Sequence, residues 1–479
     1  MEKINYKDLD LKIGLEVHRQ INTGKLFCRC QSILIEDKPD FIIERKLRPI
    51  ISELGERDIA AEYESSKGKY AIYEAHYKNT CELELDESPV FEINQEALNV
   101  ALQISKMLNA KIFSTVEVMR KQVLDYSNTS GFQRTMLIAA DGDVKTKSGN
   151  IKIDTIVLEE DAARKINETE KFVTFRLDRL GTPLIEIATA PEVKTPEQAK
   201  EVAEFLGMIL KSTGKFKSGI GTIRQDINLS IKNGARIELK GVQDLRSIPK
   251  IIDIEINRQF EIIKTGKKVE SGVRKINPDL TSAYLRPLPG KARMYAETDH
   301  PLIVISKVHL DNIKIPELII DKSMKLEEEY NLSKELANEI VKENKIGLFE
   351  DFANKFKNLT PGLIAHILIE TPKEIESKFK IKTEKLDEDI FENILAALNT
   401  EKISKNSVID ILVEYIKTGK LEIEKYKVID IQELEEEIKT IVENNKDLKF
   451  GAIIGIIMDK FKGKVEGKLA SELIKKYKK

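Results

Sequence analysis

The chain has 479 residues, a formal net charge of −2 and a pI of about 6.4. This balance is not that of a nucleic-acid binder that is basic overall, although local basic patches are compatible with it. No apolar run approaches the ~20 residues of a membrane helix, the start lacks a signal-peptide pattern, and three cysteines argue against a secreted disulfide framework. We therefore expect a cytoplasmic protein without membrane segments, long enough for about three domains.

Short strand-like runs dominate the chain up to about residue 314, and turn-forming pairs such as Asp141-Gly142 separate them. The runs lie at 12–18, 151–158, 172–177, 184–189, 236–240 and 302–306. Amphipathic helical periodicity appears at 94–108, 195–212 and 248–264. The pair Asn233-Gly234 predicts a hairpin, because it favours the tight turn between two antiparallel strands. The first part of the chain is therefore predicted to be α+β with a mostly antiparallel sheet.

From about residue 315 onward the sequence is almost wholly helical. Periodic segments lie at 325–330, 334–343, 349–356, 361–369, 389–397, 407–417 and 431–444. In the last segment, 450–479, Gly451 and Gly455 leave room for close helix contact. We predict three domains: an α+β domain over 1–314, a helical domain over 315–384 and a helical tail over 385–479.

Acidic residues and one histidine stand inside apolar, strand-like runs. The runs are 14–18 (GLEVH), 156–161 (IVLEED), 183–187 (PLIEI) and 222–229 (TIRQDINL). A carboxylate in such a strand is costly to bury unless it is ion-paired or bound to a cation. A single case is usually an ion pair, but several over two hundred residues indicate carboxylates that converge on Mg²⁺ and a phosphorylated ligand.

Some of these residues are spaced to share one face of a strand. Glu16 and His18 combine a carboxylate with an imidazole, which suits a divalent cation, although a surface pair on an edge strand is the alternative. The same spacing recurs at Asp226 and Asn228 and at Glu238 and Lys240. Lys121, which follows Arg120, could offset negative charge on a transferred phosphoryl group. The sequence contains no P-loop motif.

The cysteines are a second candidate metal site. Cys28 and Cys30 have C-x-C spacing, and together with Cys81 they could share a Zn²⁺ with a fourth ligand such as His76. Buried, reduced cysteines without a metal are the alternative.

Lysines gather near the end of the chain, at Lys460, Lys462, Lys464 and Lys468. They could contact a phosphate backbone, with each lysine releasing a counterion. A solvated helix face is the alternative.

Four stretches resemble the B and E subunits of tRNA-dependent amidotransferases. They are 14–18 (GLEVH), 26–30 (LFCRC), 158–162 (LEEDA) and 181–187 (GTPLIEI), and 451–455 (GAIIG) with Lys462-Gly463-Lys464 resembles the tail domain of these subunits. The resemblance covers nearly the whole chain. Further stretches resemble the archaeal E branch of the family: 47–55 (LRPIISELG), 119–123 (MRKQV), 127–134 (SNTSGFQR) and 295–299 (YAETD). The C-P-x-C segment of many B subunits is absent.

The resemblance implies a glutamine-synthetase-like antiparallel cradle, followed by a helical domain and a helical tail that binds tRNA. It also implies a reaction: ATP and Mg²⁺ phosphorylate the side-chain carboxylate of glutamate esterified to tRNA(Gln), and ammonia then displaces the phosphate to give Gln-tRNA(Gln). The ammonia would arrive through a channel from an asparaginase-like glutaminase, the D subunit, because this chain lacks glutaminase machinery.

Site roles are carried over on the same basis. His18, Glu160 and Glu16 would be the Mg²⁺ ligands, and Lys121 would contact phosphate. Glu16, Lys121, Glu160 and Asp226 would be the catalytic set. Arg120, Gln133, Arg134, Glu186 and Glu238 would bind ATP or the acylated 3′ end.

Two departures from the family pattern stand out. E subunits usually carry an insertion that resembles part of a bacterial aspartyl-tRNA synthetase, whereas here Lys264 is followed by Tyr284 within about twenty residues. Ala296 also stands where the family usually has proline.

Two other functions compete with that of an E-type subunit. One is a B-type subunit that also acts on Asp-tRNA(Asn), and the other is a non-catalytic tRNA-binding subunit.

Overall fold

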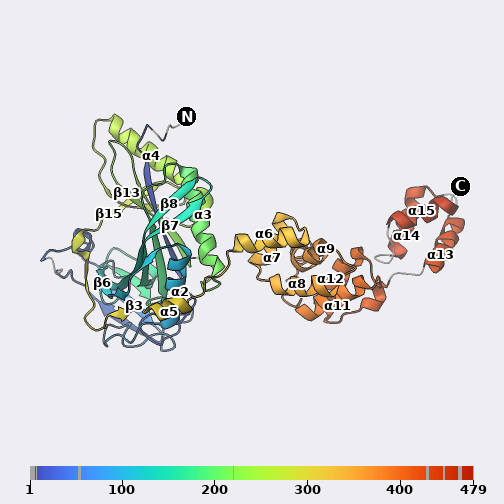
Figure 1. The fold of residues 1–479 in the computed structure, drawn as a ribbon, viewed down its shortest axis with the longest axis horizontal. Coiled ribbons are helices and arrows are strands. Elements are labelled where there is room, and N and C mark those ends of the chain that lie inside the picture. The colour runs from blue at the N-terminus through green and yellow to red at the C-terminus, as the bar shows by residue number, and fades with distance from the viewer. Residues whose placement is uncertain are drawn as a thin grey trace. The chain divides into compact units, whose positions relative to one another are not determined.

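The computed structural model describes residues 6, 8–51, 55–219, 221–427, 431–445, 448–461 and 467–477. The chain divides into two compact units, Met1–Pro316 and Glu317–Lys479. The first is α+β and the second is helical, as the sequence predicted, and Figure 1 colours them from blue to yellow and from yellow to red (Figure 1). None of the described helices combines the length and apolarity needed to cross a membrane.

One large, mostly antiparallel sheet organises the first unit. Its strands follow the order β15-β14-β13-β12-β1-β11-β8-β7-β6-β16, and β4 pairs with β7 from outside this path. Only β13 and β14 run parallel among these neighbours. In chain order the strands are β1 Lys12–Gln20, β4 Lys111–Ile112, β6 Met119–Gln122, β7 Phe132–Thr146, β8 Gly149–Glu160, β11 Pro183–Thr189, β12 Ile223–Ser230, β13 Ile237–Val242, β14 Gly272–Ile276, β15 Ser282–Arg286 and β16 Met294–Ala296.

Two smaller sheets complete the strands. One has the order β2-β3-β10-β9, with β2 at Phe41–Arg45, β3 at Tyr70–Ala75, β10 at Phe172–Arg176 and β9 at Arg164–Glu168. The other pairs β5, Thr115–Val116, with β17, Ile303–Val304. The predicted hairpin at Asn233-Gly234 is confirmed, because β12 and β13 pair antiparallel. Residues 231–236 connect the two strands, and Asn233 has φ 62°, a left-handed conformation that asparagine tolerates.

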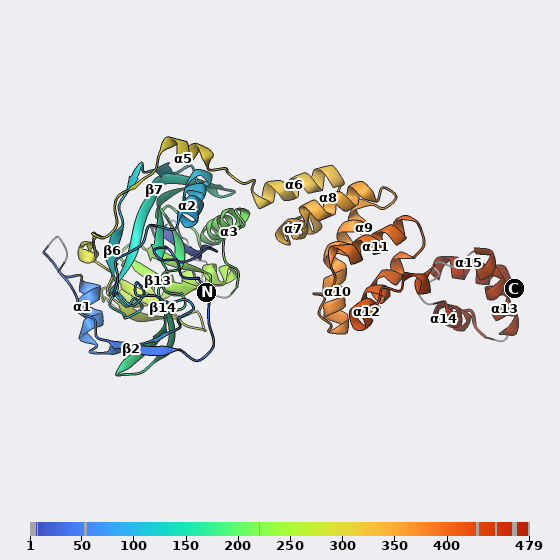
Figure 2. The ribbon, with the colours of Figure 1, turned by 90° about the horizontal axis from the view of Figure 1, so that it is seen from below.

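Helices cover one face of the large sheet and leave the other face open. Helices α2 (Gln95–Met107) and α3 (Pro196–Ser212) pack on β1, β7 and β8, and α4 (Ile248–Lys264) lies beside α3 (Figures 1 and 2). The three helices match the predicted segments closely, because Asn94 and Thr195 cap the first two through their side chains. On the covered face Ile156 and Leu158 are fully buried, whereas Leu137 on the open face is 41 % exposed.

The large sheet must curl around its open face. Its two edge strands, β15 and β16, are joined by residues 287–293 alone. A flat path of ten strands would be about 43 Å wide at ~4.8 Å per strand gap, whereas this connection reaches at most about 28 Å. The edges therefore approach each other, and the open face is concave.

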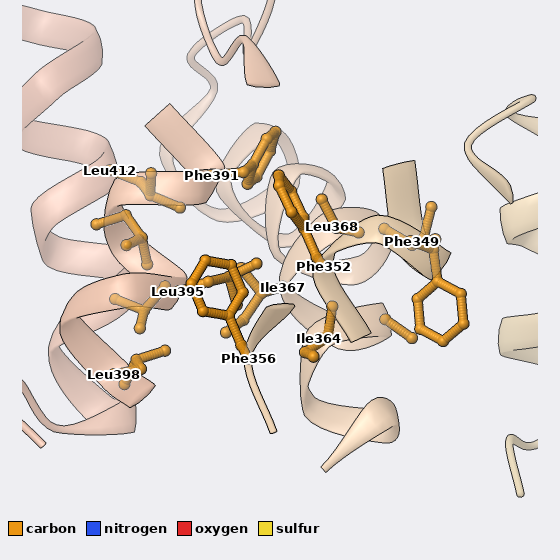
Figure 3. Close-up of a cluster of buried hydrophobic side chains, with 14 of the residues drawn as sticks. Phe349, Phe352, Phe356, Ile364, Ile367, Leu368, Phe391, Leu395, Leu398 and Leu412 are labelled. Atoms are coloured by element: carbon orange, nitrogen blue, oxygen red, sulfur yellow. The ribbon is translucent and has the colours of Figure 1, made fainter. Parts of the chain in front are cut away.

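The second unit contains two separate hydrophobic cores. The larger core runs from Leu326 to Ile416, and Figure 3 shows its centre, where Phe349, Phe352 and Phe391 meet apolar side chains of neighbouring helices (Figure 3). The smaller core joins α13, α14 and α15 through residues such as Leu434, Ile453 and Ile474. The boundary predicted at 384/385 falls inside the larger core, because α11 and α12 contribute buried residues to it.

The remaining helices are α1 Ile59–Ser66, α5 Lys307–Asn312, α6 Ile319–Tyr330, α7 Lys334–Lys342, α8 Ile346–Lys355, α9 Pro361–Ala365, α10 Thr371–Phe379, α11 Glu388–Asn399, α12 Val408–Thr418, α13 Ile431–Asn444, α14 Phe450–Lys460 and α15 Gly467–Tyr477.

Candidate functional site

The register of three central strands brings the predicted acids together on the open face. Strand β1 lies between β11 and β12, so that His18 is opposite Glu186 on one side and Arg224 on the other. Glu16 is opposite Asp226 in the same way. Side chains two residues apart point to the same face of a strand. Residues that are far apart in the sequence therefore form one acidic surface.

Two groups of side chains on this surface could hold a divalent cation. Glu16, His18 and Asp226 form one group, and His18, Glu159 and Glu186 form the other; within each group the ligand atoms lie within 4.8 Å of one another. Carboxylate oxygens are the ligands that Mg²⁺ prefers. The residues present therefore fit the ion that the sequence predicted. Glu16 and His18 are in these groups as expected, and Asp226, Glu159 and Glu186 are further members.

His18 is the residue that the two groups share. Its Nε2 is 3.1 Å from Glu186 Oε2, while its Nδ1 is buried and has no partner among the described residues. Burial disfavours the protonated ring, but the hydrogen bond and charge of Glu186 outweigh burial and raise the pKa of His18. A buried ring nitrogen without a hydrogen bond is costly, and a metal ion would satisfy it.

Lysines compensate the acids of this surface. Lys240 Nζ lies 2.7 Å from Asp226 Oδ2 and 2.7 Å from Glu238 Oε1. Lys121 contacts Glu159 and lies 4.0 Å from Glu186 Oε2. Burial opposes ionisation of Glu186, but Lys121 and His18 hold its pKa well below the usual range. Lys121, for which a phosphate contact is predicted, thus lies beside Glu159 and Glu186.

Glu16 differs from its neighbours because no cation contacts it among the described residues. Asn228 Nδ2 donates to its Oε1 at 2.9 Å. Burial and the nearby charges of Glu186 and Glu238 raise the pKa of Glu16 to about 7. Glu16 also borders a cavity of about 330 Å³, which opens where the small residues Gly14 and Ala188 face the concave side.

The structure does not place Glu160 with His18. Its Oε2 accepts hydrogen bonds from the backbone N of Arg134 at 3.2 Å and from Arg134 Nη1 at 3.4 Å. Arg134 Nε in turn donates to Glu297 Oε2 at 2.9 Å. Adjacent strand residues point to opposite faces, so Glu159 reaches the open face and Glu160 the covered one. Glu160, which we expected to join Glu16 and His18, is in neither candidate metal group, and its neighbour Glu159 lies with His18 and Glu186 instead.

Arg120 and Gln133, two other predicted site residues, make internal contacts. The Arg120 guanidinium contacts Glu297 and lies 4.7 Å from the ring centroid of Phe132. Gln133 Nε2 donates to the backbone oxygen of Glu160 at 2.6 Å. Together with Arg134, these side chains hold β6, β7 and the segment around Glu297 together.

The three cysteines converge, and Glu84 is the fourth member of their group. Ligand atoms of Cys28, Cys30, Cys81 and Glu84 lie within 4.8 Å of one another. Cys28 Sγ is 2.9 Å from Glu84 Oε1. Hydrogen bonds from Cys28 and Cys81 lower the pKa of the Cys30 thiol, which favours the thiolate that a metal needs. The suggested fourth ligand, His76, is not in the group.

A fully buried lysine adjoins the cysteine group. Lys25 Nζ lies 3.1 Å from Glu84 Oε1, and its side chain is fully buried. Three thiols with one carboxylate are a ligand set that Zn²⁺ accepts. The donor set therefore fits the predicted zinc, and Glu84 is the member of the group that sequence reasoning missed.

The predicted tRNA-binding lysines are described only in part. Lys460 Nζ lies 2.5 Å from Glu437 Oε2 in an exposed pair. Lys462 and Lys464 lie outside the described residues, and so does the side chain of Lys468.

Comparison with known proteins defines the class to which this fold and site belong. The family model for the GatB/GatE catalytic domain matches residues 11–311, and the model for the GatB domain matches residues 347–477. The chain belongs to the GatB/GatE family.

Relatives match over their whole length. The chain is 35% identical to the E subunit of glutamyl-tRNA(Gln) amidotransferase from Methanocaldococcus jannaschii, with 99% of each chain covered. It is 35% identical to the corresponding E subunit from Saccharolobus solfataricus and 33% identical to that from Methanosarcina acetivorans, again over 99% of each chain.

The relatives are longer than this chain. The alignment with the Methanocaldococcus jannaschii protein spans 625 positions, whereas this chain has 479 residues, so more than a hundred positions are filled by the relative alone. In this chain residues 265–271 alone connect α4 to β14. That the missing segment falls here stays a prediction.

Assignment of the metal groups to the open face can be tested with Mn²⁺, which takes the same oxygen ligands as Mg²⁺. We expect Glu159→Gln to weaken Mn²⁺ binding at least about tenfold, because it removes a ligand. Glu160→Gln is the matched control and should leave the affinity within about twofold. Electron paramagnetic resonance titration measures free Mn²⁺ directly. Equal losses in the two variants would show that the assignment by strand face is wrong.

The cysteine group is tested by its zinc content. We expect about one Zn²⁺ per chain after purification without chelator, and less in Cys30→Ser and Glu84→Gln, because each variant removes a ligand. His76→Gln is the control that should keep its zinc. Mass spectrometry of the metal gives the stoichiometry, and a zinc content that depends on His76 and not on Glu84 would contradict the four-residue group.

Proposed function

We propose that this chain is the component of a tRNA-dependent amidotransferase that converts Glu-tRNA(Gln) into Gln-tRNA(Gln), using ATP and Mg²⁺. The observation that carries the proposal is the similarity to E subunits over 99% of the chain. The convergence of Glu16, His18, Glu159, Glu186 and Asp226 supports it, because such a group suits a cation that binds phosphates.

The chemistry requires an activated carboxylate. A carboxylate is a poor acyl donor, so the γ-phosphoryl group of ATP is transferred to a side-chain oxygen of glutamate, and ADP leaves. Ammonia then attacks the carbonyl carbon, and the C–O bond to phosphate breaks to give the amide and inorganic phosphate. A bound Mg²⁺ would stabilise the negative charge of the phosphate groups.

The residues of the concave face have distinct tasks in this scheme. Glu16, His18 and Asp226, together with Glu159 and Glu186, would hold Mg²⁺. Lys121 would contact the phosphoryl group and oppose its developing negative charge. Its present contact with Glu159 keeps the ammonium group beside the group of His18, Glu159 and Glu186.

The curl of the sheet supports the proposed cradle. Ten strands whose edges are joined by residues 287–293 form a hollow that opens over the acidic surface. Such a hollow can exclude water from the acyl phosphate, which would otherwise hydrolyse. We propose that this hollow is the glutamine-synthetase-like cradle that the sequence resemblance implied.

The amidotransferase needs partners that this chain does not contain. Ammonia would come from an asparaginase-like D subunit through a channel, since free ammonia is mostly protonated in neutral water. The tRNA would be held by helices α13, α14 and α15. Part of their charge is already compensated, because Lys460 and Lys476 pair with Glu437 and Glu435. We propose a cytoplasmic heteromeric enzyme.

The reaction is tested with the purified chain, ATP, Mg²⁺ and ammonium chloride in place of the glutaminase. We expect ADP formation that depends on Glu-tRNA(Gln), and a loss of at least about a hundredfold in Glu159→Gln with unchanged tRNA binding, since only the metal site is altered. Arg246→Gln, which changes an exposed pair with Asp244, is the control.

The same assay separates the competing functions. Amidation of Asp-tRNA(Asn) at a comparable rate would favour a B-type protein. An absence of tRNA-dependent ADP formation, with tRNA binding intact, would favour a non-catalytic tRNA-binding role and overturn the proposal.

The role of the tail in tRNA binding is tested by a truncation that leaves the larger hydrophobic core intact. A cut at residue 385 would remove Phe391 and Leu395 from the larger core, whereas a cut after Lys427 leaves that core whole. We expect the chain 1–427 to bind tRNA at least about tenfold more weakly and with a shallower salt dependence, because phosphate contacts are lost. Mn²⁺ binding should not change. Unaltered tRNA affinity and salt slope in a fluorescence titration would contradict the role of the tail.

A further inference from the structure

Two arginines stand at the ends of the segment that joins the edges of the large sheet. Arg286 is the last residue of β15, and Arg293 directly precedes β16. Both residues line a cavity whose other charged residues are Asp58, Glu64 and Asp125. The two edges of the curled sheet thus bring two cations into one small space.

Neither arginine has an acidic partner among the residues that the structure describes. Arg293 Nε donates to the backbone oxygen of Gln122 at 3.0 Å, which is a neutral acceptor. The carboxylates of the cavity have other partners. Asp58 Oδ1 accepts from the backbone N of Ala61 at 3.0 Å and its Oδ2 from that of Gly290 at 2.8 Å. Glu64 pairs with Lys67, and Asp125 Oδ1 accepts from the backbone N and the hydroxyl of Ser127. Among the other buried or half-buried arginines of the described residues, Arg120, Arg134 and Arg176 each form an ion pair, whereas Arg19 does not.

The two charges act on each other. Both side chains are half-buried. Burial and the charge of Arg286 lower the pKa of Arg293. Bringing two like charges together away from bulk water costs free energy, and an anion between them removes that cost. Guanidinium groups are suited to this, since their planar forks bind phosphate oxygens in pairs.

The arginine cavity also lies within electrostatic reach of the acidic surface. The charges of Glu159 and Glu238, both on the concave face, act on Arg293 and partly oppose the fall of its pKa. Glu159 belongs to one of the two candidate metal groups. A ligand that reached from the metal groups to the arginines would therefore meet a cation at one end and two guanidinium groups at the other.

We propose that Arg286 and Arg293 bind one phosphate group, as a phosphate subsite of the reaction described above. This inference rests on the proposed function for the identity of its ligand. Three kinds of phosphate take part in that reaction: the phosphates of ATP, the inorganic phosphate that leaves, and the phosphodiester next to the acylated end of the tRNA. The shared chemistry is a phosphate with at least two free oxygens.

Binding measurements without turnover test the subsite and identify the source. Titration calorimetry of the full chain with inorganic phosphate, with the non-hydrolysable ATP analogue AMP-PNP plus Mg²⁺, and with uncharged tRNA(Gln) supplies three arms. We expect Arg286→Gln and Arg293→Gln each to weaken at least one ligand about tenfold or more, since each removes a charge-assisted pair of hydrogen bonds. Arg246→Gln, at an exposed position, is the control for loss of charge.

The ligand whose affinity falls in the variants identifies the source of the phosphate. Loss confined to AMP-PNP assigns the subsite to ATP, loss that includes inorganic phosphate assigns it to the leaving group, and loss confined to tRNA assigns it to the phosphodiester. Arg286→Lys and Arg293→Lys keep the charge but not the paired donors, so their losses should be intermediate. This second series also applies if a glutamine variant fails to fold.

The subsite and the proposed function fail in different ways. Wild-type affinity for all three ligands in folded Arg286→Gln and Arg293→Gln would overturn the subsite, whatever the enzyme catalyses. Arginine-dependent phosphate binding in a chain that does not amidate Glu-tRNA(Gln) would keep the subsite and overturn the reaction.

Discussion

The antiparallel pairing of β1 between β11 and β12 is the constraint on which the site depends. It sets Glu16 opposite Asp226 and His18 opposite Glu186, although these residues are separated by more than a hundred positions in the chain. Because side chains alternate between the two faces of a strand, Leu15 and Val17 lie on the covered face, where both are fully buried. A slip of one residue would bury the acids and expose the core. The hydrophobic packing of this face therefore also fixes the geometry of the acidic surface.

Much of this could be predicted from the sequence because the patterns are local. The helices α2, α3 and α4 have strong periodicity and clear first residues, and in the hairpin Asn233 adopts a left-handed conformation that asparagine tolerates. The helix α1 carried no such signal, since its apolar pattern is weak, and it was missed. The extent of the larger helical core was missed too, because which helices share a core depends on contacts between segments that periodicity does not reveal.

The structure places Glu159 beside His18, where the sequence analysis named Glu160, and this difference has a simple cause. Glu159 and Glu160 are adjacent acids, and composition alone does not distinguish them. Counting by two from Ile156 and Leu158, which are apolar and buried, puts Glu160 on the covered side and Glu159 on the open side. Glu84 was harder to foresee, because it lies in a turn after Cys81, and no regular spacing ties a turn residue to a distant C-x-C pair.

The lysines of the concave face give the acidic surface a resident set of cations. Lys240 bridges Asp226 and Glu238, and Lys121 contacts Glu159. A divalent ion that enters either group must compete with a lysine ammonium group for a carboxylate. Loading the site therefore exchanges the cation that contacts the carboxylate. Each displaced ammonium keeps its full charge and its flexible stem. The hollow thus becomes more positive as the metal enters. Its attraction for a polyanionic substrate therefore depends on whether the metal is bound, and not only on which residues line the hollow.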